Sequence, residues 1–449
     1  MTSTAKRILC ATLCIMTALA ASCGGEKEAV PEKPLPPIKT NVNLVENPSF
    51  EEWDGQVPSG WRIMHFSGDG EVMTRFGRTT EKVKSGESAF FLRGLFNTDR
   101  FMVLTQRMPV RTGYTLVLAA DVAVEGIKRN RGQEDNANLY IRFYDADGER
   151  VSDRYFADLW TERRSGTSGY RRQLRKMAVP EQAVEMEVGI INQMTGHLYV
   201  DDVDVHLEEE LVWVEEETEY VRFFHLEGHP FPDHAVAEET EMVGHFQEKY
   251  DLDIGEKVKY YWYPSEQRFM DYFGTTRYRP RRNWAKKELH TAAPVEDHEM
   301  LHMLLVDYGY PPAGLAKGFV FVMRGEWRGW NPHRPVKGFI LEKRVPALYK
   351  TIPIEKFRET DFSITVPAWA SFSKYLIDLY GKERYMELYE KADGINDAPK
   401  FNALFNDVYD EDFDVVDRAW RLALLRMTFE TDEEQGDIDV PADQLEDVE

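Results

Sequence analysis

The chain has 449 residues, of which 43% are hydrophobic and 30% are charged, a composition and length that fit two or three globular domains. Its 55 basic and 78 acidic residues give a net charge of −23, which would repel a phosphate backbone over most of the surface and argues against nucleic-acid binding. All three cysteines lie within the first 23 residues, so the rest of the chain can form no internal disulfide.

The N-terminus has the pattern of an export signal. Two basic residues precede an apolar run from Ile8 to Ala20, which is too short to span a bilayer as a helix, so we expect residues 1–22 to be a signal peptide. The motif Leu19-Ala20-Ala21-Ser22-Cys23 resembles the lipobox of bacterial lipoproteins, although its leucine stands one place further from the cysteine than usual. The resemblance implies a lipid on Cys23, a membrane as partner, and a location in the bacterial cell envelope, at the outer membrane or facing the periplasm. An ordinary signal-peptidase site just before the cysteine is the alternative.

A proline-rich tether follows the candidate lipidation site. Residues 23–43 contain four prolines among polar residues, which stiffens a chain into an extended spacer. No later stretch reaches the length of a membrane span.

The next segment, residues 44–208, has the pattern of an all-β module. Runs at 116–124, 138–145 and 197–207 are rich in β-formers and are separated by Gly, Asp and Asn clusters. Many short strands without helical periodicity predict a sandwich or a jelly roll.

Motifs at both ends of this segment carry a resemblance. Asn43 to Glu51 (NLVENPSFE) and Tyr199 to Val203 (YVDDV) resemble the opening and closing motifs of galactose-binding-like jelly rolls that serve as carbohydrate-binding modules. The resemblance implies a jelly-roll sandwich, a glycan as possible partner, and a structural Ca²⁺ held by Glu51 and Asp202. The alternative is that Glu51 caps a turn and Asp202 faces solvent.

Four aromatic residues of this segment are candidates for stacking on sugar rings, because an aromatic face is large, rigid and amphipathic. Aromatic residues of a sandwich more often belong to its core, so both assignments stay open. The candidates are Trp61, Tyr155, Trp160 and Tyr170.

The last module, residues 218–430, mixes strands with helices. Strands are predicted at 220–226 and 257–263 with a helix at 235–250 between them, and apolar residues three and four apart predict three C-terminal helices. This pattern indicates an α+β domain. The three C-terminal helices are expected at 369–380, 382–392 and 411–427.

The run from Pro294 to Gly309 contains the most informative motif. Proline suits the start of a helix and glycine its end, so we predict one helix over the whole run. His298 and His302 then lie on one face and can direct both imidazoles at one ion. With Glu299 as general base, this is the His-Glu-x-x-His pattern of zinc metallopeptidases, in which zinc polarises a water and the scissile carbonyl.

The order of elements around this run resembles the gluzincin-like, peptidase-MA-like superfamily: a strand and helix, a short strand at 288–291, the metal helix, and a later helix pair. The resemblance implies a zincin-like α+β fold, a Zn²⁺ cofactor and peptide-bond hydrolysis. It also implies a third zinc ligand from the glutamate of a Leu-x-Glu-Gly helix.

This sequence departs from the family at the third ligand. The corresponding run is Leu315-Ala316-Lys317-Gly318, and an ammonium would repel a nearby dication. Glu326 is the other candidate ligand, but nine residues along a helix turn it about 180° away from Lys317 unless Gly325 breaks the helix.

Three functional classes therefore remain. The leading hypothesis is a membrane-anchored zinc metallopeptidase of the cell envelope, and the second is a catalytically inactive zincin fold that binds a protein or glycan, with Lys317 in place of the metal and paired with Glu299. The third is a scaffold without a cleft. The basic run at 277–282 could guide an acidic partner, but a solvated loop is the favoured interpretation. The ten acidic residues after Phe429, without a basic one, predict a disordered tail at 431–449.

Overall fold

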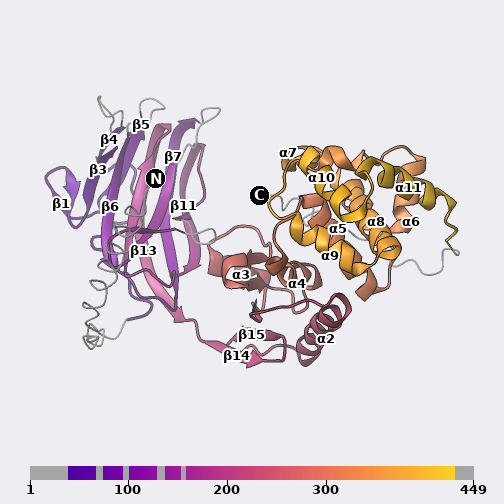
Figure 1. The fold of residues 1–449 in the computed structure, drawn as a ribbon. Coiled ribbons are helices and arrows are strands. Elements are labelled where there is room, and N and C mark those ends of the chain that lie inside the picture. Colours follow the sequence, from indigo (N-terminus) through magenta and orange to yellow (C-terminus); the bar gives the residue numbers. More distant parts are fainter. Residues whose placement is uncertain (1–38, 67–73, 95–100, 129–136, 153–157, 430–449) are drawn as a thin grey trace, which may run out of the picture. The chain divides into compact units, whose positions relative to one another are not determined.

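The computed structural model describes residues 39–66, 74–94, 101–128, 137–152 and 158–429 (Figure 1). The signal peptide, Cys23, most of the tether, Tyr155 and the acidic tail lie outside these ranges, so those assignments stay predictions. No helix in the described ranges is both long and apolar enough to cross a bilayer.

The N-terminal module is an antiparallel β-sandwich, which confirms the predicted class. The first sheet has the order β10-β8-β12-β6-β3, with β9 paired to β8, and the second has the order β11-β7-β13-β5-β4. A short hairpin, β1 (Trp53–Asp54) and β2 (Val57–Pro58), precedes them. The first sheet comprises β3 (Arg62–Phe66), β6 (Phe101–Pro109), β8 (Ala137–Tyr144), β9 (Arg150–Val151), β10 (Leu159–Trp160) and β12 (Glu185–Asn192). The second comprises β4 (Thr74–Thr79), β5 (Ala89–Gly94), β7 (Tyr114–Lys128), β11 (Gly166–Ala178) and β13 (Thr195–Glu210).

Strand β13 shows why these residues form a sandwich. Val203, Val205 and Leu207 are buried, whereas the intervening Asp204 and His206 are not, which is the alternation of a strand with one face on the core. The start of the module is fixed to the same strand. Asn43 donates from Nδ2 to the carbonyl of Val203 at 2.8 Å and accepts from the N–H of Val205 at 3.0 Å.

The C-terminal module is built on a mixed sheet with the order β14-β15-β16-β18-β17. Strands β15, β16 and β18 run parallel, and the two edge strands, β14 and β17, run antiparallel to their neighbours. Among the described strands, β17 thus forms one edge of this sheet. The bounds are β14 (Trp213–Glu217), β15 (Val221–Leu226), β16 (Val258–Trp262), β17 (Arg281–Asn283) and β18 (Glu288–Thr291).

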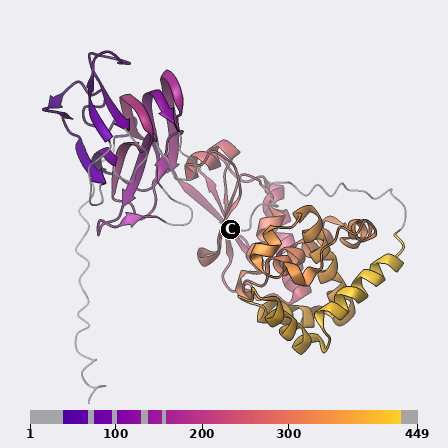
Figure 2. The same ribbon diagram turned by 90° about the horizontal axis from the view of Figure 1, so that it is seen from above.

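Helices and this sheet share one apolar core that extends from Val221 to Leu424. The helices coloured orange to yellow pack on one another in both views (Figure 2). The helices are α2 (Asp233–Tyr250), α3 (Glu266–Phe273), α4 (Asp297–Leu304), α5 (Ala313–Arg328), α6 (His333–Leu341), α7 (Ile354–Arg358), α8 (Phe362–Tyr380), α9 (Lys382–Lys391), α10 (Ala398–Tyr409) and α11 (Phe413–Arg426). Single 3₁₀ turns are η1 (Trp284–Lys286), η2 (Val306–Tyr308) and η3 (Leu348–Thr351).

The helix predicted from Pro294 to Gly309 is shorter than expected. Helix α4 begins at Asp297 and ends at Leu304, and the 3₁₀ turn η2 follows it. The start shifts because the backbone N–H of Glu296, the N-cap residue, donates to the carboxylate of Glu239 on α2 at 2.5 Å. A contact between distant segments thus sets the first turn.

Helix α5 lies directly against α8. A Cβ added at Gly314 would lie 2.2 Å from the indole Nε1 of Trp369, and one added at Gly318 would lie 2.7 Å from the backbone of the same residue. Both distances are far below a van der Waals contact, so only glycine permits this approach. The glycines hold α5, and with it Lys317, at a fixed place beside α4.

Candidate functional site

The two histidines of α4 lie side by side. The ring centroids of His298 and His302 are 5.0 Å apart, as their spacing of four residues predicts. His298 is only 3% exposed. The Nδ1 of His298 and the Nε2 of His302 are buried and have no hydrogen-bond partner among the described residues. Taken alone, this pair could offer two nitrogen ligands.

Cationic side chains surround the pair. Burial lowers the pKa of His298 well below its ordinary value, and the charges of Lys317, Arg282 and Arg324 lower it further. Burial also lowers the pKa of His302, with Arg282 and Lys317 again contributing. Both imidazoles are therefore neutral at physiological pH, in a field that disfavours any added positive charge.

Glu299, the candidate general base, is engaged by an arginine from the edge strand β17. The Nε of Arg282 lies 2.7 Å from Oε2 of Glu299, and both side chains are largely buried. The guanidinium of Arg282 also lies 4.6 Å from the ring of Trp284. The predicted solvated loop at 277–282 is therefore wrong for Arg282, because β17 brings it against α4. Apart from its position in a basic run, nothing in the sequence indicated that Arg282 belongs to the site.

The two candidates for the third ligand lie apart on one continuous helix. Helix α5 runs through Gly325 to Arg328, so the glycine does not break it. Lys317 is 8% exposed and lies close enough to His298 to lower its pKa. Glu326 instead forms an ion pair with Lys249 at 2.9 Å and accepts a hydrogen bond from the hydroxyl of Tyr250 at 2.9 Å. The structure therefore does not bring Glu326 to the histidines.

These residues do not fit a catalytic zinc ion. Zinc needs a third protein ligand beside the two histidines, and no three His, Cys, Asp or Glu side chains gather at metal-binding distance anywhere in the described ranges. The position that the resemblance implies for the third ligand holds Lys317, and the carboxylate that the resemblance implies as general base contacts Arg282.

A large cleft opens beside α4. Its volume is about 1440 Å³, and His302, Lys317 and Trp284 are among the residues that line it. Segments that line it come from residues 275–284, from η2 and the start of α5, and from residues 354–362 and 389–396. The predicted scaffold without a cleft is therefore contradicted.

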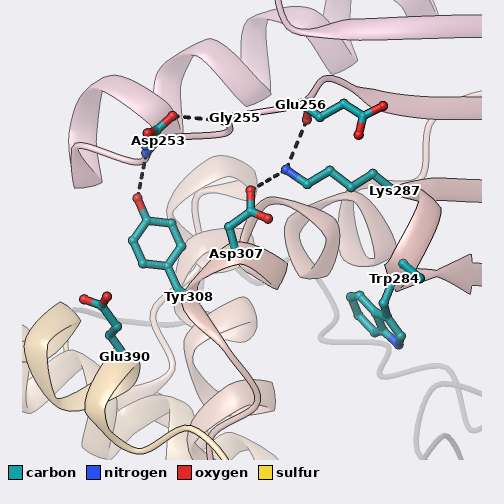
Figure 3. A pocket seen from close by; sticks show the side chains of 9 residues that line it. Asp253, Gly255, Glu256, Trp284, Lys287, Asp307, Tyr308 and Glu390 are labelled. Atoms are coloured by element: carbon teal, nitrogen blue, oxygen red, sulfur yellow. Dashed lines mark hydrogen bonds and ion pairs between the residues drawn. The ribbon is translucent and has the colours of Figure 1, made fainter. Parts of the chain in front are cut away.

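A smaller hollow of about 530 Å³ shares Trp284 with the cleft (Figure 3). Within it the ammonium of Lys287 binds the carboxylate of Asp307 and the backbone carbonyl of Glu256, the latter at 3.1 Å. The hydroxyl of Tyr308 accepts the N–H of Asp253 at 2.6 Å. Lys287, which immediately precedes β18, is thus held by contacts with η2 and with the turn after α2. The hollow remains acidic because four carboxylates line it: Asp253, Glu256, Asp307 and Glu390.

Two carboxylates meet at the start of α4: Glu239 of α2 and Glu296, the N-cap residue. Burial raises the pKa of Glu239 to about 8, and the charge of Asp297 adds to that shift. Burial also raises the pKa of Glu296 to about 8, with further contributions from the charges of Glu299, Asp297 and Glu239. Oε1 of Glu239 accepts the N–H of Glu296, whereas Oε2 has no hydrogen-bond partner among the described residues. The protonated form of Glu239 is therefore favoured in the folded state.

This raised pKa predicts a pH-dependent stability. The folded state retains a proton on Glu239 that the unfolded state loses near its ordinary pKa of 4.5, so the free energy of unfolding falls as pH rises from about 4.5 to about 8. Glu239→Gln keeps the acceptor and removes the titration. We expect its urea midpoint to fall less than that of the wild type between about pH 5 and about pH 8. The matched control is Glu241→Gln, an exposed site on the same helix, and an unchanged pH slope in Glu239→Gln would refute the assignment.

In the β-sandwich, both candidate calcium ligands accept hydrogen bonds from the loop before β5. Oε1 of Glu51 accepts the N–H groups of Glu87 and Ser88 at 3.0 and 3.2 Å, and Oδ1 of Asp202 accepts the hydroxyl of Ser85 at 2.7 Å. A Cβ at Gly86 would overlap Oε1 of Glu51, at 2.0 Å. These hydrogen bonds engage one oxygen of each carboxylate, and the calcium assignment stays a prediction.

The candidate sugar-stacking residues lie mainly against the protein. Trp61 is 5% exposed, and its ring centroid lies 5.3 Å from that of Phe50. Trp160 packs on Tyr140 with a centroid distance of 5.1 Å, and the hydroxyl of Tyr170 donates to the carbonyl of Lys82 at 3.0 Å. Of these three rings, Trp61 belongs to the core.

Comparisons with known proteins find no matching family model and no matching curated protein. Solved structures do match. A CBM61 module in complex with β-1,4-galactotriose is 15% identical over 37% of this chain and 99% of that chain, with a TM-score of 0.24. A xylan-binding CBM22 domain is 12% identical over 38% of this chain and 99% of that chain, with a TM-score of 0.26. The tailspike protein 4 of bacteriophage CBA120 is 17% identical over 37% of this chain but only 21% of that chain, with a TM-score of 0.28. The sandwich assignment rests on the strand order described above, and these similarities carry no further argument.

Proposed function

We propose that the C-terminal module binds a polypeptide in the cleft beside α4 without hydrolysing it. The observation that carries this proposal is the pair of cations at the histidines: Lys317 lies close enough to His298 to lower its pKa, and Arg282 contacts the carboxylate of Glu299. Together they replace the charge that a metal would supply. In this proposal the cleft itself is the functional surface, and no metal-dependent reaction takes place in it.

The size of the charge effect supports binding without a metal. A dication about 4 Å from one ammonium would be repelled by roughly 8 kcal/mol at an effective dielectric constant of about 20. Zinc sites with a full ligand set gain about 10–16 kcal/mol from the metal. The repulsion by Lys317 would cancel most of that energy even before the missing third ligand is considered.

The edge strand β17 favours a polypeptide as the ligand. Its residues Arg281 and Arg282 line the cleft, and among the described strands β17 pairs with β18 alone. An extended peptide can add to such an edge through backbone hydrogen bonds. If Cys23 carries a lipid, the module would present this cleft from a membrane surface.

Purified wild-type protein, supplied with zinc, tests the proposal. We expect it to bind no stoichiometric zinc and to leave unfolded protein substrates uncut, because the site lacks a third ligand and its carboxylate contacts Arg282. Cleavage that is lost with a chelator and in Glu299→Gln would refute the proposal. The matched control is Glu288→Gln, which alters a partly buried glutamate on β18 outside the histidine site.

A further inference from the structure

The lining of the cleft beside α4 is positively charged, whereas the protein as a whole is negatively charged. Six cationic side chains line it, and no aspartate or glutamate is among its described lining residues, although the whole chain carries −23. A cleft with walls of one sign focuses the field and concentrates ions of the opposite sign. The six are Arg277, Arg279, Arg281, Arg282, Lys317 and Arg358.

Two of these cations are available at the surface. Arg277 and Arg358 are exposed, and neither guanidinium takes part in an ion pair within the described ranges. They come from separate parts of the chain, the segment before β17 and the end of α7, and both reach the same cleft. Guanidinium groups bind carboxylates through two parallel hydrogen bonds. A ligand with several carboxylates can therefore engage both segments at once.

Apolar side chains line the same cleft. Leu305 and Val306 lie at the end of α4 and the start of η2, and Ile354 and Phe362 lie at the starts of α7 and α8. A polyphosphate or a nucleic-acid backbone has nothing to bury against such residues. An extended acidic polypeptide offers both kinds of group, because acidic and apolar side chains can alternate along it.

We infer that the cleft binds an acidic polypeptide segment. This inference rests on the proposed binding function and adds the class of ligand. Arg277 and Arg358 bind its carboxylates, and the apolar residues of the lining bury its apolar side chains. The acidic hollow beyond Trp284 (Figure 3) repels the same ligand and confines it to the cleft.

The occupant that the chain itself offers is its acidic end. Residues 430–449 contain ten acidic residues, no basic one, and the apolar residues Ile438, Val440, Leu445 and Val448, which complement the cationic and apolar lining of the cleft. Twenty residues span at most about 70 Å when extended, which exceeds the diameter of a domain of this size. The cleft is therefore assigned to residues 430–449 of this chain.

A labelled synthetic peptide with the sequence of residues 430–449 tests the inference on the full chain. Two receptors are compared: the wild type, and a full chain in which the ten acidic residues of the tail are replaced by their amides. We expect the peptide to bind the amide-tail chain, and its binding to weaken as salt rises. Arg277→Glu/Arg358→Glu in that chain should weaken binding roughly tenfold or more. The matched control, Arg384→Glu, changes an exposed arginine outside the cleft and should leave binding unchanged.

The two receptors distinguish the tail from a separate partner. Weaker binding to the wild type than to the amide-tail chain supports the tail as the occupant, because the tail then competes with the peptide. Equal binding overturns that assignment in favour of an acidic segment of a separate protein. The inference is overturned if the amide form of the peptide binds equally well, if a DNA oligonucleotide binds more tightly, or if the double reversal binds like Arg384→Glu. Any of these results would leave the absence of hydrolysis unaffected, whereas zinc-dependent cleavage would refute the proposed function itself.

Discussion

Replacing Lys317 with glutamate is expected to create a zinc site. The change removes the ammonium that would repel a dication and places a carboxylate beside His298 and His302, which together supply the three protein ligands of a catalytic zinc centre. We expect the zinc affinity of Lys317→Glu to exceed that of the wild type by a factor of roughly 10³ or more, since the repulsion alone is about 8 kcal/mol. Isothermal titration with zinc measures the difference.

Two further variants separate the effect of removing the Lys317 ammonium from the effect of adding a carboxylate ligand. Lys317→Met removes the ammonium without adding a ligand, so we expect an affinity between those of the wild type and Lys317→Glu. Adding His302→Ala to Lys317→Glu should abolish the gain, because only one histidine remains. If Lys317→Glu binds zinc no better than Lys317→Met, position 317 is not the third-ligand position, and the comparison with a metallopeptidase site fails.

The largest effect on stability is expected from Trp369→Ala. Trp369 is fully buried, its Nε1 donates to Oγ1 of Thr351 at 2.9 Å, and its ring packs 5.9 Å from that of Phe372. Removing a buried aromatic side chain typically costs about 3–5 kcal/mol. Gly314 and Gly318 of α5 contact this tryptophan closely, so the loss would also loosen the helix that carries Lys317.

Urea unfolding followed by the helical far-UV signal measures this cost, because all described helices belong to the C-terminal module. Leu422→Ala is the matched control, since that side chain is 55% exposed on α11 and its loss should change stability by less than about 0.5 kcal/mol. A cost below about 1 kcal/mol for Trp369→Ala would contradict the described packing of α5 on α8.

Local periodicity predicted much of the fold. The run at 138–145 coincides within one residue with β8, and the run at 382–392 coincides with α9 apart from its last residue. The spacing of four residues also predicted that His298 and His302 lie on one face of a helix, and their rings are 5.0 Å apart. Because α5 is continuous through Gly325, the spacing of nine residues predicts correctly that Glu326 faces away from Lys317. These features depend on residues that are close in the sequence.

Contacts between distant segments could not be predicted from local patterns. Arg282 reaches Glu299 only because β17 pairs with β18 at the edge of the sheet, and nothing in a basic run indicates which arginine will be buried. Helix α4 begins at Asp297 and not at the predicted Pro294, because Glu239 of α2 accepts the backbone N–H of Glu296. The charge of the cleft likewise depends on segments that meet only in the folded chain.

The most direct test of the central claim is the zinc stoichiometry of the wild-type protein. The protein is saturated with zinc, passed through a desalting column and analysed by mass spectrometry of the metal. With Lys317 at the third position and Arg282 on Glu299, we expect far less than one zinc per chain. About one zinc per chain, lost in His298→Ala, would contradict a cleft that works without a metal.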